Sequence, residues 1–302
     1  GAIGQMIIIQ MSGGLGNQMF QYALYLKLEK LGRKVKFDST SSYIRDNARP
    51  IQLAVFNIQY PEATKEELIE MTDSYMLLKD RNRRKLKGRK SKDYREEGFG
   101  YDPVVLTQDP AYLVGTFQSE LYFQDMKEQI REAFRFDQSV MQQETLAMKD
   151  TIKSTTSVSI HVRRGDYLNA EEVYGEICTD AYYDGAIKYM LEKYPDATFY
   201  LFTNDLTWAD FFVNARPFAN IVVVKDNTEY TGYLDMYLMK HCKHNIIANS
   251  SFSWWAAWLN SNREKTVIAP AKWLNSAECK DIYTDEMTLF DSEGRLVREA
   301  VQ

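Results

Sequence analysis

Short apolar runs of strand length alternate with stretches of helical periodicity along the second half of this chain. The expected strands are residues 158–162, 198–203, 221–224, 245–248 and 266–269, and the expected helices between them are residues 181–194, 208–214, 234–242 and 254–259. Strands that alternate with helices in this way form parallel sheets covered by helices on both faces. The second half is therefore restricted to an α/β domain built on a parallel sheet.

The amino-terminal end of the chain carries the same alternation once more. Residues 6–11 form an apolar run, residues 18–31 have helical spacing, and residues 33–37 form a second expected strand. Gly32 fits the carboxyl-terminal cap of the helix, because glycine adopts the left-handed conformation that ends many helices. These residues are expected to form one β-α-β unit of about thirty residues.

Past Pro50 the pattern is less regular. Further helices are expected at residues 66–79, 122–134 and 140–154, and a strand is expected at residues 111–117. A length of 302 residues suits two domains of ordinary size. We expect an amino-terminal α/β domain over residues 1–155 and a carboxyl-terminal α/β domain over residues 156–302.

The charge distribution excludes one class of partner. The formal net charge is −5, whereas nucleic-acid binders carry a basic excess. Residues 81–95 depart from this balance, because lysine and arginine crowd the stretch. Such a run usually forms a solvated, mobile loop, which is the interpretation we favour. The alternative is a patch that contacts an anionic membrane surface or a lipid-phosphate carrier.

Cysteine usage and hydropathy indicate the compartment. Cys178, Cys242 and Cys279 are odd in number and far apart, which predicts neither a disulfide framework nor a zinc site and favours a reducing compartment. No apolar run reaches the length that spans a bilayer. We expect a cytoplasmic protein, with peripheral contact to the inner face of the membrane through residues 81–95 as the alternative.

A basic hexad follows the first expected strand of the second half. Its sequence, HVRRGD, covers residues 161–166. Arginine binds phosphate through a planar fork and stays charged at any working pH, and the carboxyl ends of parallel strands are where such ligands bind. Residues two apart on a strand share a face, so His161 and Arg163 are expected to point together. Arg164 would then point away, pair with Asp166 or brace the turn. The hexad predicts a site for a phosphorylated small molecule.

A glycine turn, residues 12–17, connects the first expected strand to its helix. It fails as a dinucleotide-binding motif, because Met19 stands where the third glycine belongs, and it fails as a P-loop, because no Gly-Lys-Ser/Thr follows. What remains is a helix amino terminus with backbone amides exposed by Gly14 and Gly16. Asn17 is either the N-cap of this helix or an amide directed at a sugar hydroxyl or a phosphate oxygen.

Two further polar segments follow expected strands. Asn249, Ser250 and Ser251 precede the tryptophan-rich helix, and they exceed what a helix cap needs, so a second anion site is expected there. Asn204 and Asp205 end another strand, where they either accept hydrogen bonds from a nucleotide or cap the next helix; the sequence leaves both readings open.

Metal ligands are missing from the sequence pattern. No Asp-X-Asp tripeptide occurs, and the three histidines form no zinc motif. We therefore expect the charge of a bound phosphate to be met by arginine and helix termini, with no metal and no other cofactor.

These segments together resemble the bacterial α-1,2-fucosyltransferases. Residues 161–167 are similar to their hallmark motif, which is shared more loosely with α-1,6- and protein O-fucosyltransferases. Residues 12–23 (SGGLGNQMFQYA) resemble their amino-terminal motif, and residues 235–259 their carboxyl-terminal motif. Residues 115–123 resemble a GYFQSEKYF-like segment, departing from it at Thr116 and Leu121. The resemblance implies a GT-B fold, with two Rossmann-like domains facing a central cleft, and metal-independent transfer from GDP-fucose with inversion.

The resemblance also implies roles for individual residues. Arg163 would hold the β-phosphate of GDP, and Asn17 would lie beside the reacting centre; Asp166 is a further catalytic candidate. The other residues expected at GDP-fucose are Gly14, Gly16, His161, Arg164, Asn204, Asp205, Ser250, Ser251 and Phe252. Gln118 and Glu120 are expected to contact the acceptor. The general base stays unassigned among Asp38, Glu120 and Asp166.

The expected activity is transfer of L-fucose from GDP-fucose to the 2-hydroxyl of a terminal galactose in a glycan, which is lipid-linked in one version of the hypothesis. Two alternatives stay open. One is an α-1,6- or protein O-fucosyltransferase that shares the arginine motif, and the other is a non-catalytic protein that binds a GDP-sugar.

Overall fold

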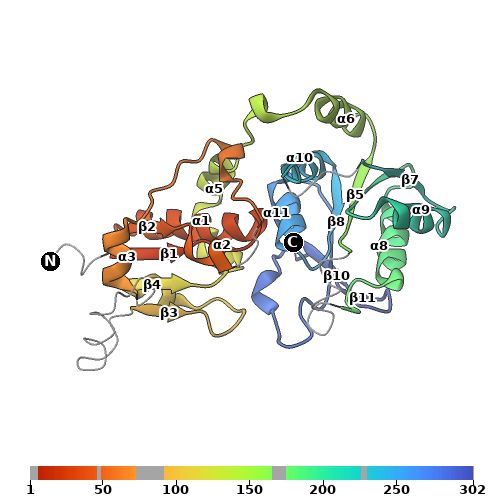
Figure 1. Ribbon diagram of the computed structural model, residues 1–302. Coiled ribbons are helices and arrows are strands. Elements are labelled where there is room, and N and C mark those ends of the chain that lie inside the picture. The colour runs from red at the N-terminus through yellow and green to blue at the C-terminus, as the bar shows by residue number, and fades with distance from the viewer. Residues whose placement is uncertain (1–5, 46–48, 73–91, 165–174, 226–229, 302) are drawn as a thin grey trace. The chain divides into compact units, whose positions relative to one another are not determined.

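The computed structural model describes residues 6–45, 49–72, 92–164, 175–225 and 230–301. Its internal contacts divide the chain into two units, Gly1–Arg135 and Phe136–Gln302. Each unit contains one sheet of mainly parallel strands with helices beside it (Figure 1). The expectation of two α/β units is therefore confirmed.

The first unit has a four-stranded parallel sheet in the order β2-β1-β4-β3. Its strands are β1 (Met6–Gln10), β2 (Lys34–Asp38), β3 (Asp93–Arg95) and β4 (Ala111–Val114). Its α-helices are α1 (Leu15–Lys30), α2 (Ser41–Arg45), α3 (Lys65–Met71) and α5 (Lys127–Ala133), and short 3-10 helices span Leu53–Phe56, Pro103–Thr107, Glu120–Tyr122 and Gln124–Met126. The apolar side chains of β1 are buried, which places the core of this unit around that strand.

The structure changes several of the sequence-based expectations in this unit. Strand β4 stops at Val114 rather than at residue 117, because Phe117 adopts a left-handed backbone with φ of 52° and turns the chain. Asp93–Arg95 form the edge strand β3, so the carboxyl end of the basic stretch is paired with β4 and is not a mobile loop. Residues 81–91 of that stretch lie outside the described residues. Helix α3 ends at Met71, well before residue 79, because its C-cap Thr72 has an extended backbone. The helix expected at residues 122–134 begins only at Lys127, after two 3-10 turns.

The second unit has a seven-stranded sheet in the order β11-β10-β9-β8-β5-β6-β7, in which only β11 is antiparallel to its neighbour. The strands are β5 (Ser157–Val162), β6 (Thr198–Thr203), β7 (Asn220–Val223), β8 (His244–Ile246), β9 (Val267–Pro270), β10 (Met287–Phe290) and β11 (Leu296–Arg298). The helices are α6 (Gln143–Lys153), α8 (Asp180–Lys193), α9 (Leu206–Asn214), α10 (Tyr233–His241) and α11 (Ser251–Leu259), with 3-10 turns at Gln138–Val140 and Lys280–Ile282. Helices α10 and α11 pack together on one side of the sheet, and α8 and α9 lie on the other (Figure 1).

The segment before β5 belongs to the second unit. Helix α6 packs on α10, the hydroxyl of Tyr233 donates to the carbonyl of Val140 at 3.3 Å, and the hydroxyl of Tyr237 lies 3.2 Å from the side-chain oxygen of Gln138. The division of the chain therefore precedes α6, whereas the expectation of domains 1–155 and 156–302 assigned that helix to the first unit.

Strand order creates one switch point in each sheet. The chain leaves β1 to form β2 on one side and later adds β4 on the other, and it leaves β5 to form β6 and later adds β8 on the opposite side. In open parallel sheets the crevice at such a point, outside the carboxyl ends of the strands, is where ligands bind. The glycine turn follows β1 and the basic hexad begins on β5, so both candidate segments are at switch points.

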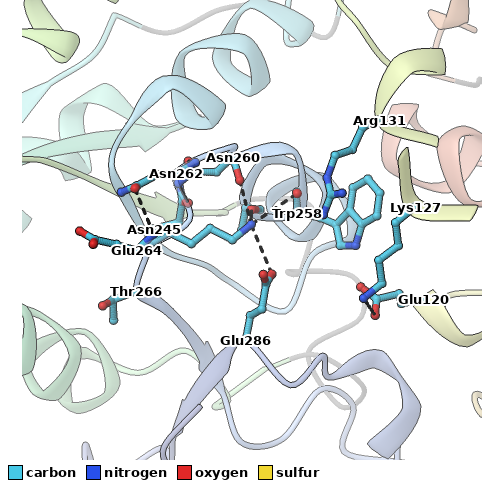
Figure 2. A network of polar contacts seen from close by, with 12 residues as sticks. Glu120, Lys127, Arg131, Asn245, Trp258, Asn260, Asn262, Glu264, Thr266 and Glu286 are labelled. Atoms are coloured by element: carbon cyan, nitrogen blue, oxygen red, sulfur yellow. Dashed lines mark hydrogen bonds and ion pairs between the residues drawn. The ribbon is translucent and has the colours of Figure 1, made fainter. Parts of the chain in front are cut away.

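Helix α11 is anchored at its carboxyl end. The ammonium of Lys265, whose side chain is 6% exposed, donates to the carbonyls of Ala257 (2.8 Å) and Asn260 (2.9 Å) and pairs with Glu286 at 3.3 Å. The side chain of Asn260 in turn donates to Asn245 of the central strand β8 at 2.8 Å (Figure 2). These contacts satisfy carbonyls that a helix end leaves open and fix α11 beside the sheet.

None of the helices within the described residues combines the length and the apolar composition that crossing a bilayer requires.

Candidate functional site

The carboxyl end of β5 and the first turn of α11 meet at the switch point of the second sheet. His161 lies on β5, and its ring centroid is 5.7 Å from that of Phe252 on α11. Because β8 leads into α11 and pairs directly with β5, the two segments singled out in the sequence become neighbours. The structure thus brings together one residue from each.

His161 is buried, with 8% exposure, and its Nδ1 atom has no hydrogen-bond partner within the described residues. Its own carbonyl accepts from the hydroxyl of Tyr183 at 2.8 Å. Burial, with the charge of Arg163 adding to it, lowers the pKa of His161 to about 3. The imidazole is therefore neutral at physiological pH and offers a hydrogen bond rather than a charge. His161 thus differs from the arginines of the hexad, because burial and the neighbouring guanidinium keep its ring uncharged.

Arg164 is held by contacts at the ends of β5 and β6. Its guanidinium lies over the ring of Trp208 at 4.5 Å and pairs with Asp205 at 3.5 Å. The side chain of Asn204 bonds both backbone groups of Arg164, accepting from its N–H at 2.8 Å and donating to its carbonyl. Arg164, Asn204 and Asp205, each of which was expected at GDP-fucose, therefore form one cluster around Trp208, which the sequence analysis did not single out.

Asp205 caps the helix that follows it, which is one of the two roles that the sequence left open. It is the N-cap of α9, because its Oδ1 accepts from the backbone N–H of Trp208 at 3.0 Å. Its remaining oxygen faces Arg164, which is the ion-pair partner observed here. Asp166 and Gly165 lie outside the described residues.

The serine turn before α11 divides into fold-building and solvent-facing groups. Ser250 is the N-cap, accepting from the N–H of Phe252 at 3.2 Å, and Ser253 accepts from the N–H of Ala248 at 3.2 Å. Asn249 donates to the carbonyl of Trp273 at 3.1 Å. Ser251 is half-buried, and within the described residues its hydroxyl makes no such bond. Ser251 is thus the hydroxyl of this turn that the described hydrogen bonds do not commit to the fold.

The glycine turn of the first unit is closed by amide side chains. Helix α1 begins at Leu15 with Gly14 as its N-cap, so the N-cap reading of Asn17 is wrong; Asn17 lies in the first turn, beside the buried Gly16. The Oδ1 atom of Asn17 accepts a hydrogen bond from Nε2 of Gln118 at 2.7 Å. A proposed catalytic residue and a proposed acceptor residue are therefore in direct contact.

Two buried glutamines of α1 hold this turn in place, and the sequence analysis missed both. Gln18 donates to the carbonyl of Gly13 at 3.0 Å and to that of Pro50 at 3.1 Å. Gln21 donates to the hydroxyl of Ser12 and to the carbonyl of Gly115, both at 2.9 Å. Two glutamines within an apolar helix face could have indicated this role, because a buried amide needs hydrogen-bond partners.

Arg49 is a third guanidinium near a candidate site. A Cβ atom on Gly14 would lie 3.0 Å from both Cδ and Nη1 of Arg49, so this side chain covers the glycine turn. The sequence analysis missed Arg49, because this residue belongs to no recognisable motif.

Two of the three carboxylates considered as general base are engaged in the fold. Asp38 is 1% exposed and accepts from the hydroxyl of Tyr112 at 2.5 Å and from the backbone N–H of Ser41 at 3.1 Å. Burial acts to raise the pKa of Asp38, but these hydrogen bonds outweigh it and hold the pKa below its usual value. Glu120 pairs with Lys127 at 3.2 Å (Figure 2). Asp38 is therefore a brace and a weak base.

Within the described ranges, no three histidine, cysteine, aspartate or glutamate side chains gather as metal ligands would.

Replacing Gly13 by alanine is expected to lower both stability and activity. Gly13 has φ of 74°, and an added Cβ would lie 2.4 Å from Nδ2 of Asn17. Gly32 is the matched control, because it has φ of 84° but no atom within 4 Å of an added Cβ. Both variants should lose about 1–2 kcal/mol of unfolding free energy from the left-handed backbone, whereas only Gly13→Ala should lower kcat. Equal kcat in the two variants would show that displacing Asn17 has no consequence.

Unfolding free energy should fall as the pH is lowered below about 6.5. Burial lowers the pKa of His161 and His241 to about 3 and that of His244 to about 4. The unfolded chain, whose histidines have ordinary pKa values, then binds more protons than the folded chain, so acid favours unfolding. His161 alone contributes a slope of about 1.4 kcal/mol per pH unit. Urea denaturation at several pH values between 5 and 8 measures this slope, and His161→Gln should reduce it by about one proton. A flat profile would contradict the buried neutral state.

Comparison with known proteins shows the family to which this chain belongs. The family model of glycosyl transferase family 11 matches residues 2–289. An alpha-1,2-colitosyltransferase of Escherichia coli is 31% identical over 90% of this chain and 93% of that protein. The O-antigen biosynthesis glycosyltransferase WbnK of Escherichia coli is 31% identical over 87% of this chain and 93% of its own length. A galactoside alpha-(1,2)-fucosyltransferase 1 of Saimiri boliviensis boliviensis is 27% identical over 82% of this chain and 63% of that protein.

Solved structures with some similarity include the NodZ alpha-1,6-fucosyltransferase soaked with GDP-fucose, with a TM-score of 0.42 and 16% identity over 84% of this chain and 92% of that chain. POFUT1 in complex with GDP has a TM-score of 0.46 and 11% identity, covering 89% of this chain and 98% of that chain.

Proposed function

Because the chain belongs to glycosyl transferase family 11, we propose that it transfers L-fucose from GDP-fucose to the 2-hydroxyl of a terminal galactose in a glycan. One observation carries the donor assignment. At the switch point of the second sheet, two guanidiniums follow a buried, neutral His161 whose Nδ1 atom has no partner within the described residues. A nucleoside diphosphate needs this combination of charge and neutral hydrogen bonding.

In this proposal the diphosphate is bound by Arg163 and by the amino terminus of α11. Arg163 is half-buried directly after the end of β5, so its guanidinium acts where water screens charge less than it does in bulk. The partial positive charge at the start of α11, together with the Ser251 hydroxyl, adds a second group for phosphate oxygens. His161 bonds an uncharged part of the nucleotide, because it carries no charge to offer a phosphate.

Fucose transfer breaks the bond between the anomeric carbon and the β-phosphate oxygen. Positive charge develops on the sugar, and negative charge develops on departing GDP. Arg163 stabilises that negative charge in the transition state, which is where electrostatic catalysis has its largest effect. The acceptor hydroxyl attacks from the opposite face of the sugar, which inverts the configuration, and its proton passes to solvent water as the new C–O bond forms.

We propose a dissociative reaction with little help from a general base. Two observations support this version: Asp38 is bonded and has a lowered pKa, and Glu120 is paired with Lys127. Asp166 is the remaining candidate of the three. Asn17 is assigned to the sugar beside the reacting bond, with its carboxamide held by Gln118.

Transfer of colitose is a second candidate function, because the 31%-identical Escherichia coli relative is an alpha-1,2-colitosyltransferase. Colitose is fucose without its 3-hydroxyl. The two activities therefore differ by one hydroxyl on the donor sugar, and both use the same leaving group in this proposal.

The test is incubation of the protein with GDP-fucose and lactose, with and without EDTA, followed by measurement of free GDP and of the product. We expect GDP release that requires lactose, an α-1,2-linked fucosyl product identified by NMR, and equal rates with EDTA. A parallel reaction with GDP-colitose compares the two donors by kcat/KM. Tight GDP binding without product would favour the non-catalytic alternative, and an α-1,6 linkage or a protein acceptor would favour the other fucosyltransferases. Strict metal dependence would contradict the arginine-based account.

A further inference from the structure

Hydrogen bonds on either side of one short backbone turn link the edge strand of the first sheet to Asn17. This link begins at Glu96, directly after β3, passes through the turn that follows β4, and ends at the first turn of α1. Strands β3 and β4 are parallel neighbours, so the segments that follow them lie at the same edge of the sheet. The sequence analysis assigned no role to Glu96.

Glu96 binds the turn through one carboxylate oxygen. Its Oε1 accepts from the backbone N–H of Thr116 at 3.2 Å, from the hydroxyl of Thr116 at 3.4 Å and from the backbone N–H of Phe117 at 3.4 Å. The turn also approaches the glutamate closely, because a Cβ on Gly115 would lie 2.7 Å from Cβ of Glu96. A side chain at position 115 would push the two segments apart.

The turn adopts a conformation that needs such support. Phe117 is not a glycine, yet its φ is 52°, which costs on the order of 1–3 kcal/mol. Burial of its ring, edge-on to Tyr122 at 6.0 Å, offsets part of this cost. Gln21 of α1 fixes the start of the turn by donating a hydrogen bond to the carbonyl of Gly115. The turn is therefore held from both sides.

Gln118 follows this turn and contacts Asn17. Because Nε2 of Gln118 donates to Oδ1 of Asn17 at 2.7 Å, the orientation of the Asn17 carboxamide is determined. Its oxygen faces Gln118, which leaves the NH₂ group, beside Gly13, as the part that can donate. An amide that presents a donor stabilises the negative charge that develops on the departing phosphate oxygen, whereas the reversed amide would present an oxygen to it.

We propose that Glu96 and Gln118 are positioning residues: Glu96 holds the Thr116–Phe117 turn so that Gln118 fixes the Asn17 carboxamide with its NH₂ group toward the substrate. This inference rests on the proposed function only in assigning Asn17 to the reacting sugar. It gives Gln118 a role other than direct contact with the acceptor.

The environment of Glu96 agrees with a carboxyl group held inside the fold. Burial raises the pKa of Glu96 above its usual value although the bonds from Thr116 and Phe117 act to lower it, and the nearby charge of Asp102 adds to the rise. The neighbouring Glu97 is exposed and serves as the matched control.

The first experiment compares Gln118→Glu, Asn17→Asp and the double variant. A glutamate at 118 accepts but cannot donate, so Asn17 must turn its NH₂ group toward it and present oxygen to the substrate; Asn17→Asp presents oxygen directly. We expect each to lower kcat about a hundredfold, as misplaced reacting groups do, with KM for GDP-fucose changed less than about threefold. The double variant should lose no more than the single ones, because both changes remove one interaction. Unchanged kcat in Gln118→Glu, or losses that multiply, would overturn the inference.

The second experiment tests Glu96 with a readout that does not depend on catalysis. Hydrogen exchange at the amides of Thr116 and Phe117 should be faster in Glu96→Ala and unchanged in Glu97→Ala. Glu96→Gln keeps an acceptor oxygen and should restore slow exchange and most of kcat. Unchanged exchange in Glu96→Ala would overturn the brace, and Glu96→Gln as impaired in kcat as Glu96→Ala would show that the charge acts directly. If the wild-type protein transfers no sugar, the proposed function fails while the exchange result still decides the brace.

Discussion

Replacing Arg163 by alanine is expected to lower kcat for sugar transfer about a hundred- to a thousandfold, or by about 3–4 kcal/mol of transition-state stabilisation. The guanidinium is the proposed partner of the diphosphate as its charge develops. Arg163 follows the last residue of β5, beyond the carboxyl end of that strand, so the variant should remain folded. Single-turnover kinetics with GDP-fucose and lactose measure the loss, and circular dichroism with urea denaturation checks the fold.

Arg164→Ala is the matched control for that measurement. Arg164 is the adjacent arginine, but its guanidinium is bound to Asp205 and stacked on Trp208, so its loss should cost far less in kcat. Arg163→Lys should recover only part of the rate, because an ammonium group keeps the charge without the planar fork. Near-normal kcat in a folded Arg163→Ala protein, or a larger loss in Arg164→Ala, would refute the assignment of Arg163.

Trp254→Ala is expected to destabilise the protein by about 3–5 kcal/mol, as truncation of a buried aromatic side chain does. Trp254 on α11 has no exposed surface, and its Nε1 donates to the carbonyl of Ile282 at 2.7 Å. The variant leaves a cavity and an unpaired buried carbonyl. A typical domain has only about 5–15 kcal/mol of stability in total, so α11 and the Ser251 end of the donor site should be lost together on mild heating.

Phe211→Ala controls for removal of an aromatic ring from the same unit. Phe211 is 71% exposed on α9, and surface substitutions usually stay within about 0.5 kcal/mol. Urea denaturation curves of the two variants test the difference. Comparable midpoints for Trp254→Ala and the wild type would contradict the view that burial of Trp254 stabilises the second unit.

Helices and strands were predicted well where the hydrophobic periodicity and the residues that end an element indicate the same boundary. Strand β6 occupies Thr198–Thr203 as expected, because Pro195 stops the preceding helix and the polar pair Asn204 and Asp205 follows the strand. Strands β3, β10 and β11 were missed, because each contains only three or four residues, which is too short to show a period. Helix α1 begins at Leu15, three residues before the expected start, because Gly14 and Gly16 hide a helix terminus in a glycine turn.

The site was predicted at the level of segments more than of individual groups. Sequence motifs identified the basic hexad, the glycine turn and the serine turn, and each lies at the carboxyl end of a parallel strand. The supporting residues were missed, since Gln21, Glu96 and Trp208 act through partners that are distant in sequence. Asn17 was taken as an N-cap or a ligand group, and its contact with Gln118, 101 residues away, could not be read from either segment.

The sequence by itself determined that this protein has two parallel α/β halves and that arginines stand at a strand end, because these features follow from local periodicity and residue type. Only the tertiary structure decided which of those polar groups carry charge and which are committed to the fold. His161 is neutral because neighbouring elements bury it, and Arg164 is bound because β6 lies beside β5 and places Asp205 within 3.5 Å. Protonation and pairing depend on strand order, which local sequence does not encode.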